Sequence, residues 1–316
     1  MARLRSGLGS RHPRFAVATV AAGETAVGCT GVQPEADFEI GSVSKAITGL
    51  LYADACDRGE IRPDSTLGEL LPLVDCPAAH VTLSSVSRHS SGLPRLPKTP
   101  DMLKRTYAFW RHGRNPYGED LAGLLLQART VRLQSARPRY SNLGFELLGH
   151  AVAAGAGLSY RDLLADRLCT PLGLTSTYVP AAASEFGPHA LAGRSRRGSP
   201  KQPWVGEALG PAGGIRATIS DMATLARALL DGSAPGMSAL DPAMNFAGPA
   251  ARIGAAWMIL EVRGRPITWH NGATGGFSSW IGLDRDAGTG VVLLSATSAS
   301  LDRQGFRILT ELASEG

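Results

Sequence analysis

Hydrophobic and polar residues alternate with a period of two at both ends of the chain, which predicts β-strands there. Residues 15–32 (FAVATVAAGETAVGCTGV) are typical of a hairpin that turns at Gly23-Glu24. Residues 255–270 and 277–297 have the same pattern and predict two more hairpins. Their turns are expected at Arg263–Arg265 and near Asp286–Gly288.

Apolar residues recur every three or four positions in the middle of the chain, which predicts helices. The stretch FEIGSVSKAITGLLYADACDRGEI (38–61) begins like a strand and becomes a helix that we expect to stop at Gly59. A later helix is expected to be capped by Ser220 and stopped by Gly232. All helices predicted after Gly59 cover residues 120–129, 142–157, 159–173, 220–232 and 302–313.

This order of elements predicts an α+β fold, in which strands from both termini form one antiparallel sheet flanked by helices, with a mostly helical lobe inserted. We expect a single domain over residues 1–316. Its sheet lobe would comprise residues 12–60 and 205–316, and its helical lobe residues 61–204, each to within about two to four residues.

Composition excludes several classes of protein. The chain has 316 residues, is 44% hydrophobic and carries a net charge of +5. It contains no run of about 18 apolar residues, so we expect no membrane span. Its basic clusters lack interleaved aromatic residues, which indicates a solvated surface and no nucleic-acid partner. The four cysteines form no CxxC pair and have no zinc-ligand spacing, so free thiols and no metal are expected.

The N-terminus allows two interpretations. MARLRSGLGSRHPR followed by FAVATVAAG could be the basic and apolar parts of a signal peptide. The same apolar residues are needed as the first strand of the sheet. We therefore expect no signal peptide and a cytoplasmic location.

Ser42 and Lys45 are the first candidates for chemistry. Three residues apart on a helix, their side chains share one face about one turn apart. A serine hydroxyl is a weak nucleophile until a base takes its proton, and a lysine can do this when burial lowers its pKa. Arginine cannot, yet only four of the 32 basic residues here are lysines. Alternatively, Ser42 is simply a helix N-cap.

Two later segments offer partners for this pair. Tyr140 could transfer a proton, and Asn142 could hold the lysine or bind a substrate amide, although Asn142 also fits a helix N-cap. His270 lies in a predicted strand and is followed by Gly272, where glycine suggests close approach of a ligand or backbone. The N–H groups of Ala273 and Ser42 could form an oxyanion hole. His270 alone could equally be a hydrogen-bonded strand histidine.

In this order, S-x-x-K (42–45), Y-x-N (140–142) and H-x-G (270–272) resemble the motifs of the serine β-lactamase and penicillin-binding-protein superfamily, and most closely its class C branch. Further blocks, such as VTLSSVSRHSSGLP (81–94) and GPAGGIRATISDMATLARALL (210–230), extend the resemblance over most of residues 15–300. The resemblance implies that Ser42 is the acyl-forming nucleophile, Lys45 its base and Tyr140 a proton shuttle. It further implies that Asn142, His270 and Gly272 contact the substrate, and that the amides of Ser42 and Ala273 form the oxyanion hole.

The departures from that family bear on the substrate. The third motif is His-Asn-Gly, whereas Lys-Thr-Gly would bring a fixed positive charge to a substrate carboxylate. We therefore expect a serine hydrolase that cleaves a small ester or amide, with no cofactor and only a small-molecule partner. The alternatives are a D-Ala-D-Ala carboxypeptidase or β-lactamase, an intracellular acyltransferase, and a non-catalytic binding protein on the same fold. Residues 95–138, with four aromatic residues between 107 and 117, are expected to form the wall of the substrate cleft.

Overall fold

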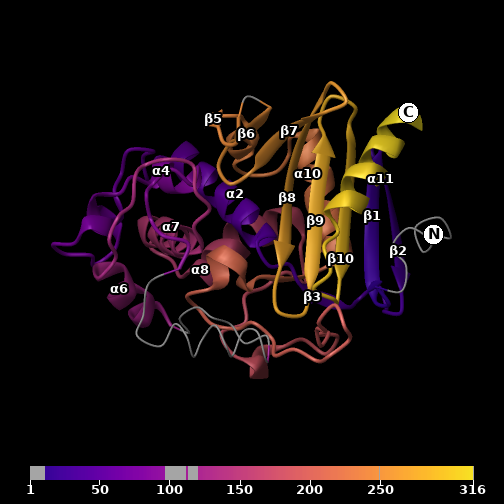
Figure 1. Cartoon of the computed structure of the whole chain (residues 1–316), viewed down its shortest axis with the longest axis horizontal. Helices are drawn as coiled ribbons and strands as arrows, with labels where there is room; N and C mark the ends of the chain where they lie inside the picture. Colours follow the sequence, from indigo (N-terminus) through magenta and orange to yellow (C-terminus); the bar gives the residue numbers. More distant parts are fainter. Residues whose placement is uncertain (1–10, 97–111, 113–119, 249, 316) are drawn as a thin grey trace.

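A computed structural model describes residues 11–96, 112, 120–248 and 250–315 of the chain. An eight-stranded sheet dominates it, with the strand order β2-β1-β10-β9-β8-β7-β6-β5 and every neighbouring pair antiparallel (Figure 1). The first strand, β1, pairs with both β2 and the last strand, β10, so both ends of the chain build the same sheet. In chain order the strands are β1 (Phe15–Ala21), β2 (Glu24–Thr30), β5 (Met244–Asn245), β6 (Ala251–Ile253), β7 (Met258–Val262), β8 (Arg265–Ala273), β9 (Ser278–Asp284) and β10 (Thr289–Ser295).

Strand alternation gives the sheet two buried faces. Phe15 and Val17 of β1 join one apolar cluster with residues of the last helix, α11 (Asp302–Glu315). Ala16 and Ala18, one residue out of phase, join the main core with α10 (Ile219–Asp231). Figure 1 shows α11 and α10 on opposite sides of the sheet. Because helices cover both faces, β9 and β10 are buried along their whole length.

The predicted hairpins are all present, with one turn displaced. The first turn lies at Ala22-Gly23, one residue earlier than predicted, because Glu24 already pairs with Ala21. Both turn residues have positive φ values, 49° and 78°, which suit the tight connections that match strand twist. The second hairpin turns at Arg263-Gly264, between the last residue of β7 and the first of β8. The third turns between β9 and β10, as predicted.

Helices from the middle of the chain gather on the side of the molecule away from β1 and β2, and α2 lies between them and the sheet (Figure 1). The longer ones are α2 (Val43–Asp57), α6 (Leu121–Arg129) and α7 (Asn142–Gly155). The shorter helices and turns are α3 (Leu67–Leu70), η2 (Pro77–His80), α4 (Leu83–Ser87), α8 (Tyr160–Leu164), η3 (Ala165–Cys169), α9 (Thr170–Leu172), η4 (Ala183–Glu185), η5 (Gly210–Gly214) and η6 (Met237–Leu240).

The helix predictions hold except at their ends. α10 begins at Ile219 and is capped by Thr218, whose hydroxyl accepts a hydrogen bond from the Asp221 N–H, so the predicted Ser220 cap is wrong. Gly232 ends this helix in the left-handed conformation, as predicted. The helix predicted over residues 159–173 is divided into α8, the π-helical turn η3 and α9.

A separate two-stranded sheet leads directly into α2. Its strands are β3 (Asp37–Glu39) and β4 (Arg216–Thr218), and only Ile40, Gly41 and Ser42 separate β3 from the helix. Arg216, the first residue of β4, has a buried side chain that bonds to the carboxylates of Asp37 and Glu39 in β3. The arrangement confirms the predicted α+β class. The boundaries predicted for the two lobes stay a prediction.

Candidate active site

Ser42 immediately precedes α2, and its hydroxyl is not used as a helix cap. Its own backbone is helical, with φ −66° and ψ −7°, and no side-chain capping bond is present. Instead, the Lys45 ammonium lies within hydrogen-bonding reach of it, with Nζ 3.3 Å from Ser42 Oγ. Ser42 thus occupies the N-cap position of α2, but its side chain is directed to the lysine one turn away and does not cap the helix.

Lys45 is fully buried in the interior of the molecule. Nζ donates a hydrogen bond to the Ala212 carbonyl of η5 and lies 4.9 Å from the centre of the Tyr140 ring. Burial disfavours the ammonium and lowers the pKa of Lys45 to about 7; the nearby carboxylate of Glu146 raises this pKa, and the positive charge of Arg95 lowers it further. At neutral pH a large fraction of Lys45 is thus a neutral amine that can accept a proton.

Tyr140 reaches the same point from the segment before α7. Its hydroxyl shares a hydrogen bond with the Ser42 side chain, although burial raises the pKa of the phenol above its ordinary value. The ring packs on His89, at 4.5 Å between ring centres. His89 Nδ1 in turn accepts a hydrogen bond from the Ser141 N–H, at 3.2 Å. The turn that follows α4 thereby fixes the plane of the tyrosine.

The end of β8 lies against the residues that precede α2. A methyl group added to Gly272 would lie 2.0 Å from the Ile40 carbonyl oxygen and 2.9 Å from the Ser42 nitrogen. Gly41 has φ +51°, and a methyl group on it would lie 2.7 Å from the Ala273 nitrogen. The backbone of Ser42 and that of Ala273 are therefore close neighbours. Only glycine at positions 41 and 272 permits this approach.

His270 is buried beside this contact, and its Nδ1 lies 2.7 Å from the Asn271 carbonyl oxygen. Since a carbonyl only accepts, Nδ1 carries the hydrogen and Nε2 is an acceptor. Burial lowers the pKa of His270 to about 4, and the charge of Lys45 lowers it too. The histidine is neutral at pH 7 and provides no cation to a substrate.

Asn142 is buried at the first position of α7, two residues after Tyr140. The N-cap of this helix is Ser141, whose hydroxyl accepts a bond from the Gly144 N–H at 2.9 Å, so the interpretation of Asn142 as the cap is wrong. Its backbone N–H donates to the Arg95 carbonyl at 3.3 Å. That bond draws the segment containing Arg95 to the site.

The structure thus brings together segments that contain all seven predicted site residues. Ser42, Tyr140 and Ala273 are at least partly exposed, whereas Lys45, Asn142, His270 and Gly272 are buried. Two charged groups of the site were missed by the sequence reasoning. Glu146 acts on Lys45 from α7, and Arg95 has its guanidinium carbon 5.9 Å from the Tyr140 ring centre.

Comparison with known proteins identifies the family. A model of the β-lactamase family matches residues 5–313. The chain belongs to the β-lactamase family. Members of this family are serine hydrolases, and the protein is accordingly an enzyme of that class. The β-lactamase-family motifs of residues 42–45, 140–142 and 270–272 are those that the site brings together.

Two curated relatives cover most of this β-lactamase-family chain. Penicillin-binding protein 4 of Amycolatopsis lactamdurans is 31% identical over 320 residues, which are 90% of this chain and 80% of that protein. The unguisins hydrolase of Aspergillus campestris is 27% identical over 317 residues, 90% of this chain and 57% of that protein.

Solved structures share the fold. A class C β-lactamase from Rhodobacter sphaeroides superposes with a TM-score of 0.81 at 22% identity, covering 99% of this chain and 98% of that one. A D-alanine carboxypeptidase from Burkholderia cenocepacia superposes with a TM-score of 0.80 at 24% identity, covering 98% and 96%. Both confirm the predicted β-lactamase-like fold.

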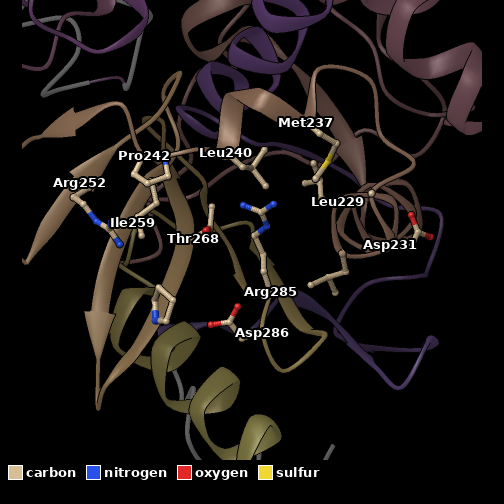
Figure 2. A pocket seen from close by; sticks show the side chains of 13 residues that line it. Leu229, Asp231, Met237, Leu240, Pro242, Arg252, Ile259, Thr268, Arg285 and Asp286 are labelled. Carbon is tan, nitrogen blue, oxygen red and sulfur yellow. The ribbon is translucent and has the colours of Figure 1, made fainter.

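A pocket of about 520 Å³ opens elsewhere on this β-lactamase-family fold, near the end of α10 and the β9–β10 turn (Figure 2). Arg252, Arg285 and Thr268 line it together with apolar side chains, and none of the seven predicted site residues does. The pocket is therefore separate from the candidate active site. The aromatic residues between 107 and 117 that were expected to line the substrate cleft fall outside the described residues.

Three further findings concern the described part of the chain: possible metal sites, membrane-spanning helices and cysteines. It holds no group of three or more His, Cys, Asp or Glu side chains arranged to bind a metal ion. Among its helices, none combines the length and hydrophobicity needed to cross a bilayer. All four cysteines are free thiols, as predicted.

Proposed function

We propose that the protein hydrolyses a small ester or amide through an acyl-enzyme on Ser42. One observation supports this most directly: the Ser42 hydroxyl lies 3.3 Å from the amine of a buried lysine whose pKa burial lowers to about 7. A base with a pKa near the working pH combines availability with driving force.

The reaction would proceed in two steps of acyl transfer. Ser42 Oγ attacks the substrate carbonyl carbon, and its proton passes to Lys45, either directly or through Tyr140. The N–H groups of Ser42 and Ala273 stabilise the oxyanion of the tetrahedral intermediate. The proton returns to the leaving alcohol or amine as the intermediate collapses. Water then attacks the ester on Ser42 and releases the acid. Both Lys45 and Tyr140 lie next to the Ser42 side chain, so either can be the first acceptor of its proton.

The neutral state of His270 favours substrates without a carboxylate near the scissile bond. An ammonium at this position would attract such an anion, whereas the imidazole of His270, buried and with a pKa of about 4, does not. Asn142, buried two residues after Tyr140, would bind the acyl amide or the ester oxygen of the substrate. The partner implied by this site is a small molecule.

A second candidate, a D-Ala carboxypeptidase or β-lactamase, is favoured by one observation. Arg95 places a positive charge beside Tyr140, where it could meet a substrate carboxylate that His270 does not attract. An intracellular acyltransferase would use the same acyl-enzyme with another acceptor in place of water.

Hydrolysis of p-nitrophenyl acetate and butyrate by the purified protein, beside Ser42→Ala, tests the first proposal. We expect turnover in the parent protein and loss of at least about a thousandfold in the variant. Mass spectrometry of the quenched reaction should find the acyl group on the Ser42 peptide. Equal rates in both proteins would refute the nucleophile. Turnover of a chromogenic cephalosporin or a D-Ala-D-Ala peptide without ester turnover would favour the second candidate.

A further inference from the structure

Glu146 is a buried carboxyl group that the scheme above leaves without a task. It lies on α7, four residues after Asn142 and therefore on the same helix face, and it is 1% exposed. Its Oε1 atom has no hydrogen-bond partner among the described residues. An unpaired carboxylate oxygen in the interior is costly, so an ordinary packing role would favour an apolar residue here.

The positive charge that acts on Glu146 through space is that of Lys45. Helix α2, which carries the lysine, packs against α7, which carries the glutamate. Burial raises the pKa of Glu146 to about 8, and the charge of Lys45 opposes this rise. In the other direction, the carboxylate of Glu146 opposes the fall in the pKa of Lys45. Each group is thus stabilised in its charged form by the other.

The other groups that interact with Lys45 differ from Glu146 in their charge at pH 7. The titratable and charged side chains that interact with Lys45 come from the loop before α7, the turn after α4, the segment that follows it, β8 and α7 itself. They are Tyr140, His89, Arg95, His270 and Glu146. The two histidines have lowered pKa values and are neutral at pH 7, and the phenol of Tyr140 is neutral as well. Among these groups, Glu146 is the acid whose ionised form can compensate the ammonium.

We propose that Glu146 is a positioning residue that stabilises the lysine ammonium formed when Ser42 loses its proton. This inference rests on the proposed function of Ser42 and Lys45. When Lys45 takes the proton, a positive charge appears in a buried site. The neutral His270 adds no second positive charge there. The carboxylate across the α2–α7 interface makes the pair neutral overall. The substrate then meets a site of nearly constant charge through the catalytic cycle.

Glu146→Gln tests this with little change in shape. Without the carboxylate the pKa of Lys45 should fall further, on the order of one unit, so the acid limb of the kcat/KM profile should move to lower pH by that amount. Lys45 also becomes a weaker base, so the plateau of kcat/KM should fall by up to about tenfold. A purely structural role would lower the plateau without moving the limb.

Two variants serve as controls. Glu69→Gln removes the same charge from an exposed position on α3, which also packs on α7, and should leave the profile unchanged. Arg95→Gln removes the cation that lowers the pKa of Lys45 and should move the acid limb to higher pH. Opposite shifts from the two charged neighbours would be difficult to produce by a general disturbance of the fold.

A second measurement does not depend on activity. The chain has only four lysines, so NMR titration of ¹³C-labelled lysine side chains resolves few signals, and Lys45→Arg identifies that of Lys45. We expect the titration midpoint of Lys45 to be lower in Glu146→Gln than in the parent protein. An unchanged midpoint overturns the inference even if Ser42 is the nucleophile. A shifted midpoint in a protein without Ser42-dependent turnover supports the coupling and refutes only the proposed function.

Discussion

Replacement of Arg216 by Met tests how the fold supports Ser42. The Arg216 side chain is fully buried, and its guanidinium lies 2.5 Å from an Asp37 carboxylate oxygen and 3.4 Å from one of Glu39. It also donates to the carbonyls of Asp37 and Leu191, each at 3.2 Å. Methionine preserves most of the volume but removes every donor. Two buried carboxylates then remain without their cation, in the strand that only three residues separate from α2.

The loss in free energy of unfolding is large because the variant removes only the cation and leaves both carboxylates buried. Breaking a buried ion pair by removing one partner destabilises a protein by about 3–5 kcal/mol, because an uncompensated charge stays in the interior. Total stabilities are about 5–15 kcal/mol, so the variant should lose a large share of its own. For a chain of this size the expected fall in Tm is on the order of 10 °C.

The loss of stability in Arg216→Met should depend on pH, and the pKa of Glu39 gives the sign of this dependence. Burial raises the pKa of Glu39 to about 7 even in the presence of Arg216, which lowers it. Without Arg216 the folded-state pKa of Glu39 rises further above the unfolded value, so the folded variant binds its proton more tightly. Lower pH therefore stabilises the folded variant relative to the parent, and the deficit should be largest above about pH 8 and shrink toward pH 5.

Urea unfolding followed by tryptophan fluorescence at both pH values measures the deficit. Arg62→Met is the matched control, because Arg62 pairs with Asp64 at 3.3 Å with both side chains mostly exposed. That exposed pair should contribute less than about 1 kcal/mol. A parent-like midpoint in Arg216→Met, or an equal deficit at the two pH values, would refute the reasoning.

Four further changes probe the site and its supports. Lys45→Arg keeps a positive charge but removes the titratable amine, and burst kinetics with p-nitrophenyl butyrate should find acylation slowed by about a hundredfold or more. Gly272→Ala places a methyl group 2.0 Å from the Ile40 carbonyl and should reduce kcat by about a hundredfold with a smaller change in KM, whereas a parent-like kcat would contradict the oxyanion-hole assignment. Ser141→Ala removes the cap of α7 and should cost about 1 kcal/mol in urea unfolding. His270→Lys should raise the ratio of kcat/KM for a p-nitrophenyl hemisuccinate over a butyrate by about tenfold, and an unchanged ratio would argue against control of substrate charge at this position.

The regular pattern of the sequence was sufficient to predict the six longer strands of the large sheet. Alternation over Phe15–Ala21 and the glycine at position 264 correctly placed a strand and a turn, since both depend on neighbouring residues. The strand expected at the start of residues 38–61 is present as β3, but its partner β4 and the edge strands β5 and β6 were not predicted. These strands have only two or three residues each, and β3 pairs with β4 across about 180 positions of sequence, which periodicity over a few residues cannot reveal.

Caps were predicted less well than helices. Ser220 and Asn142 are both good capping residues, yet the caps are Thr218 and Ser141. In each case several suitable residues lie within two positions, and tertiary contacts select among them. Ser141 is fixed by the Pro94 carbonyl and His89 as well as by its own helix.

Motif recognition found the side chains with sharp sequence patterns but missed the charges that tune them. Lys45 and Tyr140 belong to short motifs, whereas Glu146 and Arg95 act on Lys45 through space. One local signal was available for Glu146, because it lies four residues after Asn142 on an otherwise apolar helix. A charged residue on the buried face of such a helix indicates a partner, although it does not identify the partner.

Charge, more than the motifs themselves, distinguishes this site. The S-x-x-K and Y-x-N residues can perform acyl transfer on many substrates, so specificity depends on what surrounds them. Burial keeps His89 and His270 neutral at pH 7 and lowers the pKa of Lys45 to about 7, whereas Arg95 is exposed and lies beside the Tyr140 ring. A negatively charged substrate group would thus find its cation at Arg95 and not at His270. The position of the carboxylate within a substrate, rather than its presence alone, should decide whether the enzyme accepts it.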